Sequence, residues 1–297
     1  MNIHIRRPIE FEKCLDHTFA NVVTFTRQRM SVQQLLDQRD DNELLIKHLE
    51  TYCDNIGSLI SKITAGTRLE RQPSFIWVID NEQIQTPCWL FEAIVPRVVL
   101  AQLYILKGKE KANENEFKEA NRIFKCAEKR FTESYEYAKR WKWKVPKMNH
   151  RIVRTKWHMS QIHYVKCLQH QTFIGCGLQK ETGPKVMTTL ASRALASAAK
   201  SLIYWNTPES VEQLKISDGL RHIFKSNAQW NDRKYGHSIH TLQTWIRDVP
   251  ETFPLLKEEF EKIPFLLQER ITTNNGAYFD KIEAGPDMTL EEIINIK

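Results

Sequence analysis

The chain has 297 residues, of which 41% are hydrophobic, and a formal net charge of +7. This length and composition suffice for a substantial core in one large domain or two smaller ones, and they exclude a disordered chain. The 10 glycines and 11 prolines are scattered, which excludes collagen-like and low-complexity architectures.

The N-terminus and the cysteines indicate a protein of the cytoplasm. Charged residues recur every few positions in residues 1–14, so we expect no signal peptide, and no later run reaches the ~20 apolar residues of a membrane span. The six cysteines are widely spaced and form no CxxC pair. We expect reduced core thiols rather than a disulfide or zinc framework.

Short strands are predicted at residues 2–5, 22–25 and 75–79. The last of these leads into a long apolar helix that contains Glu92 and Pro96. If Glu92 is buried, its carboxylate needs a partner such as a capping amide or a tyrosine hydroxyl; the alternative is a partly exposed position at the helix edge.

Helical periodicity dominates the rest of the chain. Apolar residues recur at steps of three and four in residues 44–63, 112–141 and 185–205, and a fourth helix is expected at about 209–247. Long helices with short connections favour antiparallel helix hairpins, so we predict a mainly α fold with a small sheet, in one domain over residues 1–297. The tetratricopeptide signature does not repeat at 34 residues, so any solenoid is irregular and only TPR-like.

Residues 137–180 form a basic segment with ten lysines and arginines and no Asp or Glu. Its main cluster comprises Lys139, Arg140, Lys142, Lys144, Lys147, Arg151, Arg154 and Lys156. Interleaved with Trp141 and Trp143, these charges suit an anionic membrane surface or an acidic peptide. Single-stranded nucleic acid, with bases stacked on the tryptophans, is a second and less favoured partner, and a solvated helix end is the structural alternative.

Signals for catalysis are weak. The sequence contains no G-x-G-x-x-G, no P-loop and no G-x-S-x-G motif. His163 and Cys167 are four residues apart, and His237 and His240 are three apart, so each pair can share a helix face. Neither pair has a third partner at a suitable spacing, so we predict no catalytic site, no cofactor and no metal site.

Six stretches, in order, resemble the BRO domain, the Bro-one homology domain of ALIX, rhophilin and related scaffolds of the ESCRT pathway. They read LIKHLETYCDNIGSLISKI, FIWVID, FEAIVPRVVLAQLYILKG, EFKEANRIFKCAEKRFTESYEYAK, RKYGHSIHTLQ and NNGAYFDKIEAGPDMTLEEI. Each motif alone is weak, but their order holds across about residues 40–293. The resemblance implies a curved, banana-shaped helical array with a small sheet, in which the helix that carries Glu92 runs through the interior.

The resemblance also implies a function in binding rather than catalysis. BRO domains receive an amphipathic C-terminal helix of the polymer-forming ESCRT-III subunit on a concave face. Carried over, the two aliphatic groove positions are Val186 and Leu190, and the charged rim pair is Glu114 and Lys118. The remaining anchor, an aromatic residue in the family, is Lys166 here.

These correspondences predict a monomeric, non-enzymatic adaptor that acts in membrane remodelling and works peripherally at endosomal membranes. For Val186 and Leu190, ordinary core packing is the alternative. For the whole protein, the alternative is a BRO-like scaffold with a changed partner, either nucleic acid or another acidic protein, because a lysine cannot refill an aromatic contact.

Overall fold

The computed structural model describes residues 3–5, 22–38, 41–64, 74–144, 150–245, 249–285 and 287–295. Within these ranges the chain is mainly α-helical and has one three-stranded antiparallel sheet, which confirms the predicted fold class. The residues group into two compact units, Met1–Tyr104 with Lys129–His158 and Ile105–Glu128 with Met159–Lys297. The single domain over residues 1–297 stays a prediction.

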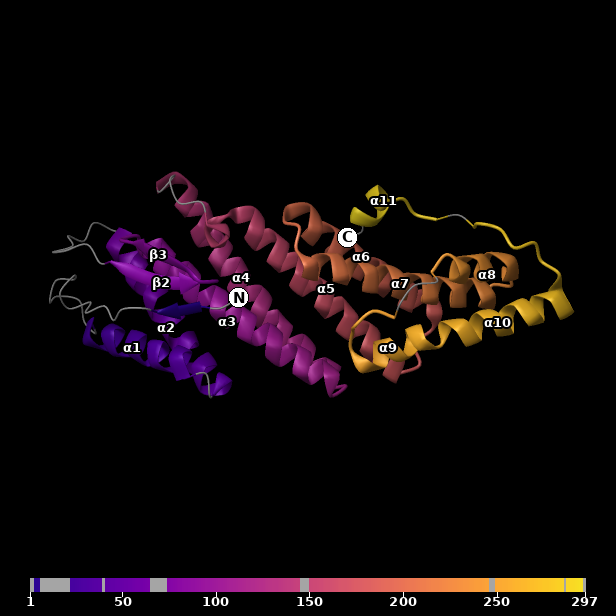
Figure 1. Cartoon of the computed structure of the whole chain (residues 1–297), viewed down its shortest axis with the longest axis horizontal. Coiled ribbons are helices and arrows are strands. Elements are labelled where there is room, and N and C mark those ends of the chain that lie inside the picture. The colour runs from indigo at the N-terminus through magenta and orange to yellow at the C-terminus, as the bar shows by residue number, and fades with distance from the viewer. Residues whose placement is uncertain are drawn as a thin grey trace. The chain divides into compact units, whose positions relative to one another are not determined.

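The first unit contains β1 (Ile3–Ile5), α1 (Val22–Gln38), α2 (Asn42–Thr64), β2 (Phe75–Ile79), β3 (Glu82–Thr86) and the short 3-10 helix η2 (Arg151–Val153) (Figure 1). Three long helices contribute to both units: α3 (Trp89–Asn113), α4 (Phe117–Lys144) and α5 (Thr155–Gln179). The second unit adds α6 (Pro184–Tyr204), α7 (Pro208–Asn231), α8 (Tyr235–Gln243), α9 (Pro254–Glu261), α10 (Ile263–Thr273), the π-helical turn η3 (Asn274–Tyr278) and α11 (Leu290–Ile294).

Most of the predicted elements are confirmed. The strand at 75–79 is β2, and the helices expected at 44–63, 112–141 and 185–205 are α2, α4 and α6. The prediction of a strand at 22–25 is wrong, because these residues form the first turn of α1. Strand β3 and the bounds of α5 were not predicted from the sequence.

The helix predicted at 209–247 is two helices, α7 and α8. Arg233 lies between them and has a left-handed backbone with φ of 61°. The amide of Lys234 donates a hydrogen bond to the carbonyl of Gln229 at 2.9 Å, and this bond caps the C-terminal end of α7. Because no glycine or proline marks this break, the sequence reads as one continuous helix.

The sheet has the order β1-β2-β3, with Ile5 opposite Trp77 and Trp77 opposite Ile84. Asp80 and Asn81 join β2 to β3 with φ of 50° and 69°. Positive φ at both central residues defines the tight type I′ hairpin turn, which Asp and Asn tolerate better than most residues. The carboxylate of Asp80 also forms an ion pair with Arg151.

Glu92, in the first turn of α3, is a fully buried carboxylate that accepts hydrogen bonds from three side chains. Tyr52 Oη donates to its Oε1 at 2.6 Å and Arg29 Nε donates to the same oxygen at 2.8 Å. Trp77 Nε1 donates to Oε2 at 2.7 Å. The buried position and the tyrosine partner are therefore confirmed, while the arginine and the tryptophan were not foreseen.

Helix α3 is apolar enough to correct one expectation of the sequence analysis. An 18-residue window within α3 has a mean hydropathy of 1.5, and the helix, with 25 residues, is long enough to cross a membrane. Of this window, 83% is buried within the folded chain. We therefore interpret α3 as a core helix, whose apolar character serves packing against its neighbours.

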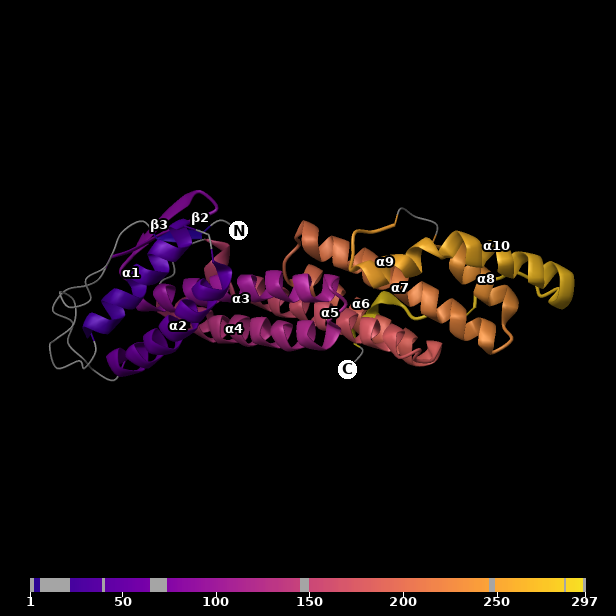
Figure 2. The ribbon, with the colours of Figure 1, turned by 90° about the horizontal axis from the view of Figure 1, so that it is seen from below.

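In the second unit, α7 packs against α6, α8 and α9 (Figures 1 and 2). Small side chains allow close approach of the helices: Ala194 and Ala198 of α6 form a buried cluster with Cys167 of α5. Leu214 of α7 packs against this cluster. The α6–α7 turn ends at Thr207, whose side chain accepts a hydrogen bond from the amide of Ser210 at 3.1 Å and caps α7.

We predict that Glu92→Gln lowers the free energy of unfolding by about 3–5 kcal/mol, because it leaves the buried Arg29 guanidinium without its countercharge. Urea denaturation of the variant and the wild type measures this difference. Glu110→Gln is the matched control, since Glu110 is an exposed carboxylate on the same helix. An equal, small effect of both substitutions would contradict a structural role for the buried charge.

Candidate partner-helix site

Val186 and Leu190 lie one turn apart on α6, at a spacing that places both on one face of the helix. The side chain of Val186 is 55% exposed, and Leu190 is half-buried. The face of α6 that enters the core is formed instead by residues such as Met187, Ala191 and Ala194, which are buried. Core packing is therefore the wrong interpretation for Val186.

A second stripe runs along α5 at steps of three and four: His163, Lys166, His170 and Phe173. Phe173 is 41% exposed, and the other three are half-buried. The ring of His163 stacks on Tyr204 of α6, with centroids 5.6 Å apart and an angle of 2° between the planes. This pair, together with the Cys167 cluster, shows that the exposed stripes of α5 and α6 are neighbours.

The turn between α3 and α4 carries Glu114, and the first turn of α4 carries Lys118. Both side chains are exposed. Gln179 Nε2, at the end of α5, donates to the carbonyl of Asn115 at 2.9 Å. Nearby, Gly175 leaves room for the ring of Phe117, since a Cβ at this position would lie 2.6 Å from the ring. The predicted rim therefore lies beside the C-terminal end of α5.

The predicted residues make the following contacts of their own. Glu114 pairs with Lys111 at 2.8 Å, rather than with Lys118. Lys166 pairs with Glu128 of α4 at 3.5 Å, and its side chain stays 42% exposed. All five groove residues thus belong to α4, α5, α6 and the α3–α4 turn within the second unit, but they do not form one bonded cluster.

The face between α5 and α6 is rich in positive charge and neutral imidazole. Burial, with help from Lys166 and Lys200, lowers the pKa of His163 to about 4. Burial also lowers the pKa of His170 to about 4, with contributions from Arg193 and Lys166. Both rings are therefore neutral near pH 7, and the fixed charges of the face are those of the lysines, Arg193 and Glu128.

Sequence reasoning missed several residues of this face, namely His163 as a ring partner, His170, Phe173, Arg193, Lys200 and Tyr204. One signal was available for α6, because residues 193, 197, 200 and 204 continue the step of three and four that begins with Val186 and Leu190. For α5, the apolar residues surround the helix, so its sequence gives no clear exposed face.

The two pairs considered for catalysis or metal binding do not form as pairs. His163 stacks on Tyr204, whereas Cys167 Sγ lies 3.3 Å from Ser217 Oγ and burial raises the pKa of its thiol to about 12. His237 Nδ1 donates to the carbonyl of Glu283 at 3.0 Å. Among the residues that the structure describes, no group of three or more His, Cys, Asp and Glu side chains is arranged to hold a metal ion.

The basic segment is only partly covered by the described residues. Lys147 lies outside them, as do the side chains of Lys142 and Lys144. Lys139 pairs with Glu136 at 3.1 Å, Arg151 pairs with Asp80, and the Arg140 guanidinium lies 5.8 Å from the ring centre of Tyr137. Arg154 and Lys156 are exposed. Acidic partners from outside the segment thus neutralise part of its charge.

We predict that acid weakens the second unit through His163 and His170. Their folded-state pKa of about 4 lies below the ordinary 6.5, so the unfolded chain binds more protons between these values. The stability present above pH 6.5 is therefore lost as the pH falls toward 4. The double variant His163→Gln, His170→Gln should show a shallower pH dependence of its denaturation midpoint. His48→Gln on α2 is the control, and an unchanged slope in the double variant would refute the assignment.

No protein-family model and no curated protein matches the sequence. Solved structures match it by fold. The chain superimposes on ALIX, in complex with the SIVmac239 PYKEVTEDL late domain, with a TM-score of 0.70 and 14% identity, over 89% of this chain and 41% of that one. It superimposes on an ALIX BRO1–CHMP4C complex with a TM-score of 0.64 and 15% identity, over 90% and 83% of the two chains.

A third structure, described as the basis for endosomal targeting by the Bro1 domain, gives a TM-score of 0.62 and 12% identity over 98% of this chain and 88% of that one. The chain spans less than half the length of the ALIX chain in the late-domain complex. At these identities the likeness concerns the fold, and it agrees with the order of motifs in the sequence. The protein has the fold of the BRO domain.

Proposed function

We propose that the protein is a non-enzymatic adaptor of the ESCRT pathway, which binds an amphipathic C-terminal helix of a polymer-forming ESCRT-III subunit. The guest helix lies on the face formed by α5 and α6, with Val186 and Leu190 as apolar anchors and Glu114 and Lys118 near its rim. This is recognition of a helix in a groove, in which apolar side chains supply affinity and rim charges fix the register.

The observation that carries the proposal is the exposed Val186–Leu190 stripe on a chain with the BRO-domain fold. One solved neighbour with this fold is a complex of the ALIX BRO1 domain with CHMP4C. The side chain of Val186 is 55% exposed, so much of its apolar surface is in contact with water. Burial of this surface under a guest helix would add roughly 1 kcal/mol to the binding free energy. Phe173 and Tyr204 extend the apolar surface available to the same guest.

Lys166 and its neighbours favour an acidic guest. Lys166, Arg193 and Lys200 line the α5–α6 face, and Glu128 is the acid paired with Lys166 there. This charge supports a guest helix with carboxylates opposite α5, and it also supports the alternative function, a BRO-like scaffold whose partner has changed to another acidic protein. Nucleic acid is the third candidate guest for a positively charged face.

The basic segment and the location of the protein enter the proposal on sequence grounds. The exposed Arg154 and Lys156 suit an acidic membrane surface, where each cation adds about 1 kcal/mol. We place the adaptor in the cytoplasm, as a monomer at the surface of endosomal or other membranes. Co-sedimentation with vesicles that contain anionic lipid, compared with neutral vesicles, tests this part separately from the guest helix.

We predict saturable binding of a fluorescent peptide from an ESCRT-III C-terminal amphipathic helix, measured by anisotropy. Val186→Asp and Leu190→Asp should each weaken binding by about 10-fold or more, because a carboxylate replaces an apolar anchor in the interface. Circular dichroism and thermal melting of each variant establish that it remains folded.

The matched control for these variants is Ile203→Asp. Ile203 is a 65% exposed aliphatic residue on α6 that lies off the Val186–Leu190 stripe. Its substitution should leave peptide affinity unchanged. Absence of binding to the wild type, or equal loss in all three variants, would reject the groove, and anionic vesicles and oligonucleotides would then be the next guests to test.

A second prediction concerns the departure at Lys166. Lys166→Phe should tighten binding of the same peptide by about 0.5–1.5 kcal/mol, or roughly 2- to 12-fold in Kd, because an aromatic ring restores the missing anchor. Lys156→Phe, at an exposed position of the same helix, is the control. Weaker binding after Lys166→Phe would instead support a guest that pairs a carboxylate with the lysine.

A further inference from the structure

The C-terminal part of the chain runs back along the second unit. After η3, residues 280–285 and 287–289 belong to no helix or strand and lead past α8 to α11, which packs against α6 (Figure 1). Gly236 permits this path, because a Cβ at that position would lie only 1.9 Å from the carbonyl oxygen of Lys281. His237 Nδ1 holds the segment by donating to the carbonyl of Glu283 at 3.0 Å.

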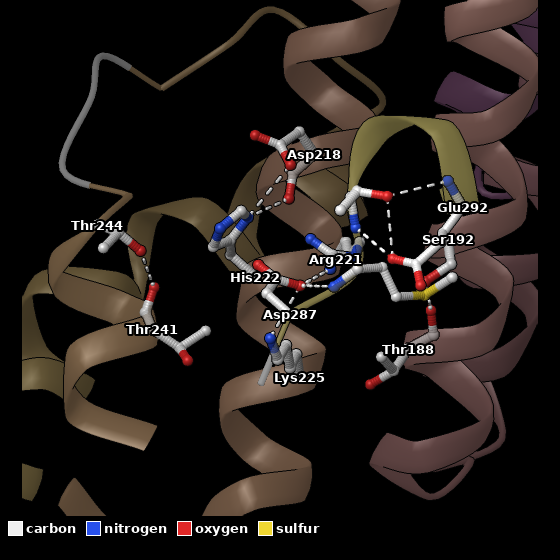
Figure 3. A network of polar contacts seen from close by, with 12 residues as sticks. Thr188, Ser192, Asp218, Arg221, His222, Lys225, Thr241, Thr244, Asp287 and Glu292 are labelled. Atoms are coloured by element: carbon white, nitrogen blue, oxygen red, sulfur yellow. Dashed lines mark hydrogen bonds and ion pairs between the residues drawn. The ribbon is translucent and has the colours of Figure 1, made fainter. Parts of the chain in front are cut away.

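Asp287 is the electrostatic anchor of this segment. Its carboxylate forms an ion pair with Arg221 and a second one, at 3.0 Å, with Lys225. Both cations are on α7, one turn apart, and Figure 3 shows Asp287 reaching them from the C-terminal segment. The Arg221 side chain is only 4% exposed, so it benefits strongly from a carboxylate at this position.

Helix α11 is the apolar anchor. Ile293 is 5% exposed and clusters with Leu195 and Ala196 of α6, against which Leu214 also packs. A capping box begins the helix: the amide of Glu292 donates to Thr289 Oγ1 at 3.2 Å, and the amide of Thr289 donates to a Glu292 carboxylate oxygen at 2.7 Å. The segment therefore contains an acidic amphipathic helix whose residue Ile293 is buried.

This attachment is small for a permanent part of the fold. A helix of 5 residues is far too short to persist without its contacts, and residues on both sides of Ile293 are exposed or half-buried. Segments with few buried apolar contacts open locally at much lower free energy than the core. The opened state uncovers an apolar surface beside two cations, which is a surface suited to an acidic helix.

We propose that Leu195, Ala196, Leu214, Arg221 and Lys225, here named the α6–α7 seat, form an exchangeable docking site. Residues 287–294 of the chain occupy the seat in cis, and an acidic amphipathic helix of another protein occupies it in trans. The chain's own segment defines the chemistry of the guest: a carboxylate placed six residues before an aliphatic residue that ends in the apolar cluster.

The seat is separate from the groove that contains Val186. Leu195 follows Val186 by nine residues, which at 3.6 residues per turn places it on the opposite side of α6, about 180° away. The two surfaces therefore accept different guests independently. The inference does not rest on the proposed binding of an ESCRT-III helix.

The test uses the full chain with its own segment weakened by Asp287→Asn and Ile293→Ser, hereafter the opened chain. The probe is a fluorescent peptide of residues 284–295, AGPDMTLEEIIN. We expect the opened chain to bind this peptide at least about 10-fold more tightly than the wild type does, because the cis segment no longer competes. A peptide that carries Asp287→Lys should bind at least about 10-fold more weakly than the unaltered peptide.

Two further substitutions in the opened chain locate the guest. Lys225→Glu should abolish peptide binding, while Lys215→Glu, at an exposed lysine of the same helix that pairs with Glu212 at 3.8 Å, should not. Equal affinity of the opened and wild-type chains, or indifference to Lys225→Glu, would overturn the proposal. Concentration-dependent dimerisation that excludes the peptide would assign the seat to a second copy and would also overturn it.

If the opened chain does not fold, amide hydrogen exchange of the wild-type chain tests the same proposal. The amides of Glu292 and Ile293 donate to the side chain and the carbonyl of Thr289, the N-cap of α11. Excess peptide should accelerate their exchange by displacing the segment from the seat, whereas peptide with Asp287→Lys should not. Unchanged exchange at saturating peptide would overturn the proposal.

Discussion

The first unit depends on the buried carboxylate of Glu92. Glu92 is in a helix that is otherwise among the most apolar of the chain, and its two oxygens accept bonds from Arg29, Tyr52 and Trp77. A carboxylate in this environment is tolerable only if all its partners are in place. The bonds therefore fix α1, α2, β2 and α3 against one another, and they favour one arrangement over other apolar packings. We regard specificity, more than added stability, as the contribution of Glu92.

In the second unit, small side chains allow the helices to pack closely. Ala194 and Ala198 bring α6 close to α5 and α7, and Leu195 with Ala196 receives α11. Because α6 packs against several helices, little of its surface is exposed to solvent. The stripe that begins with Val186 is part of this exposed surface. Alanine and serine on the packed faces would contribute little affinity for the proposed guest helix, so the larger exposed side chains would supply most of it.

Sequence periodicity was sufficient for α2, α4 and α6, but it failed for the start of α1 and did not identify all the partners of Glu92. The run Val22–Phe25 is β-branched and aromatic, which favours a strand, yet the packing of Arg29 and Val32 draws it into a helix. The partner of Glu92 was foreseen as a class, because a buried carboxylate must be satisfied. Arg29 was not foreseen, because its position relative to Glu92 depends on how α1 packs in the tertiary structure. Local sequence propensity contains no information on that packing.

The groove residues were predicted from the resemblance to BRO domains. The side chains that surround them could be identified only from the structure. That His163 faces Tyr204 follows from the register of α5 against α6, which no single-helix pattern contains. In the same register, Lys166 lies between two neutral imidazoles and pairs with Glu128, so this face has a charge where the resemblance to BRO domains implies an aromatic ring. A lysine stem covers apolar surface but keeps its ammonium in water. Under the proposed function, a guest helix that covers Lys166 would have to place a carboxylate beside it or leave the ammonium at the edge of the interface.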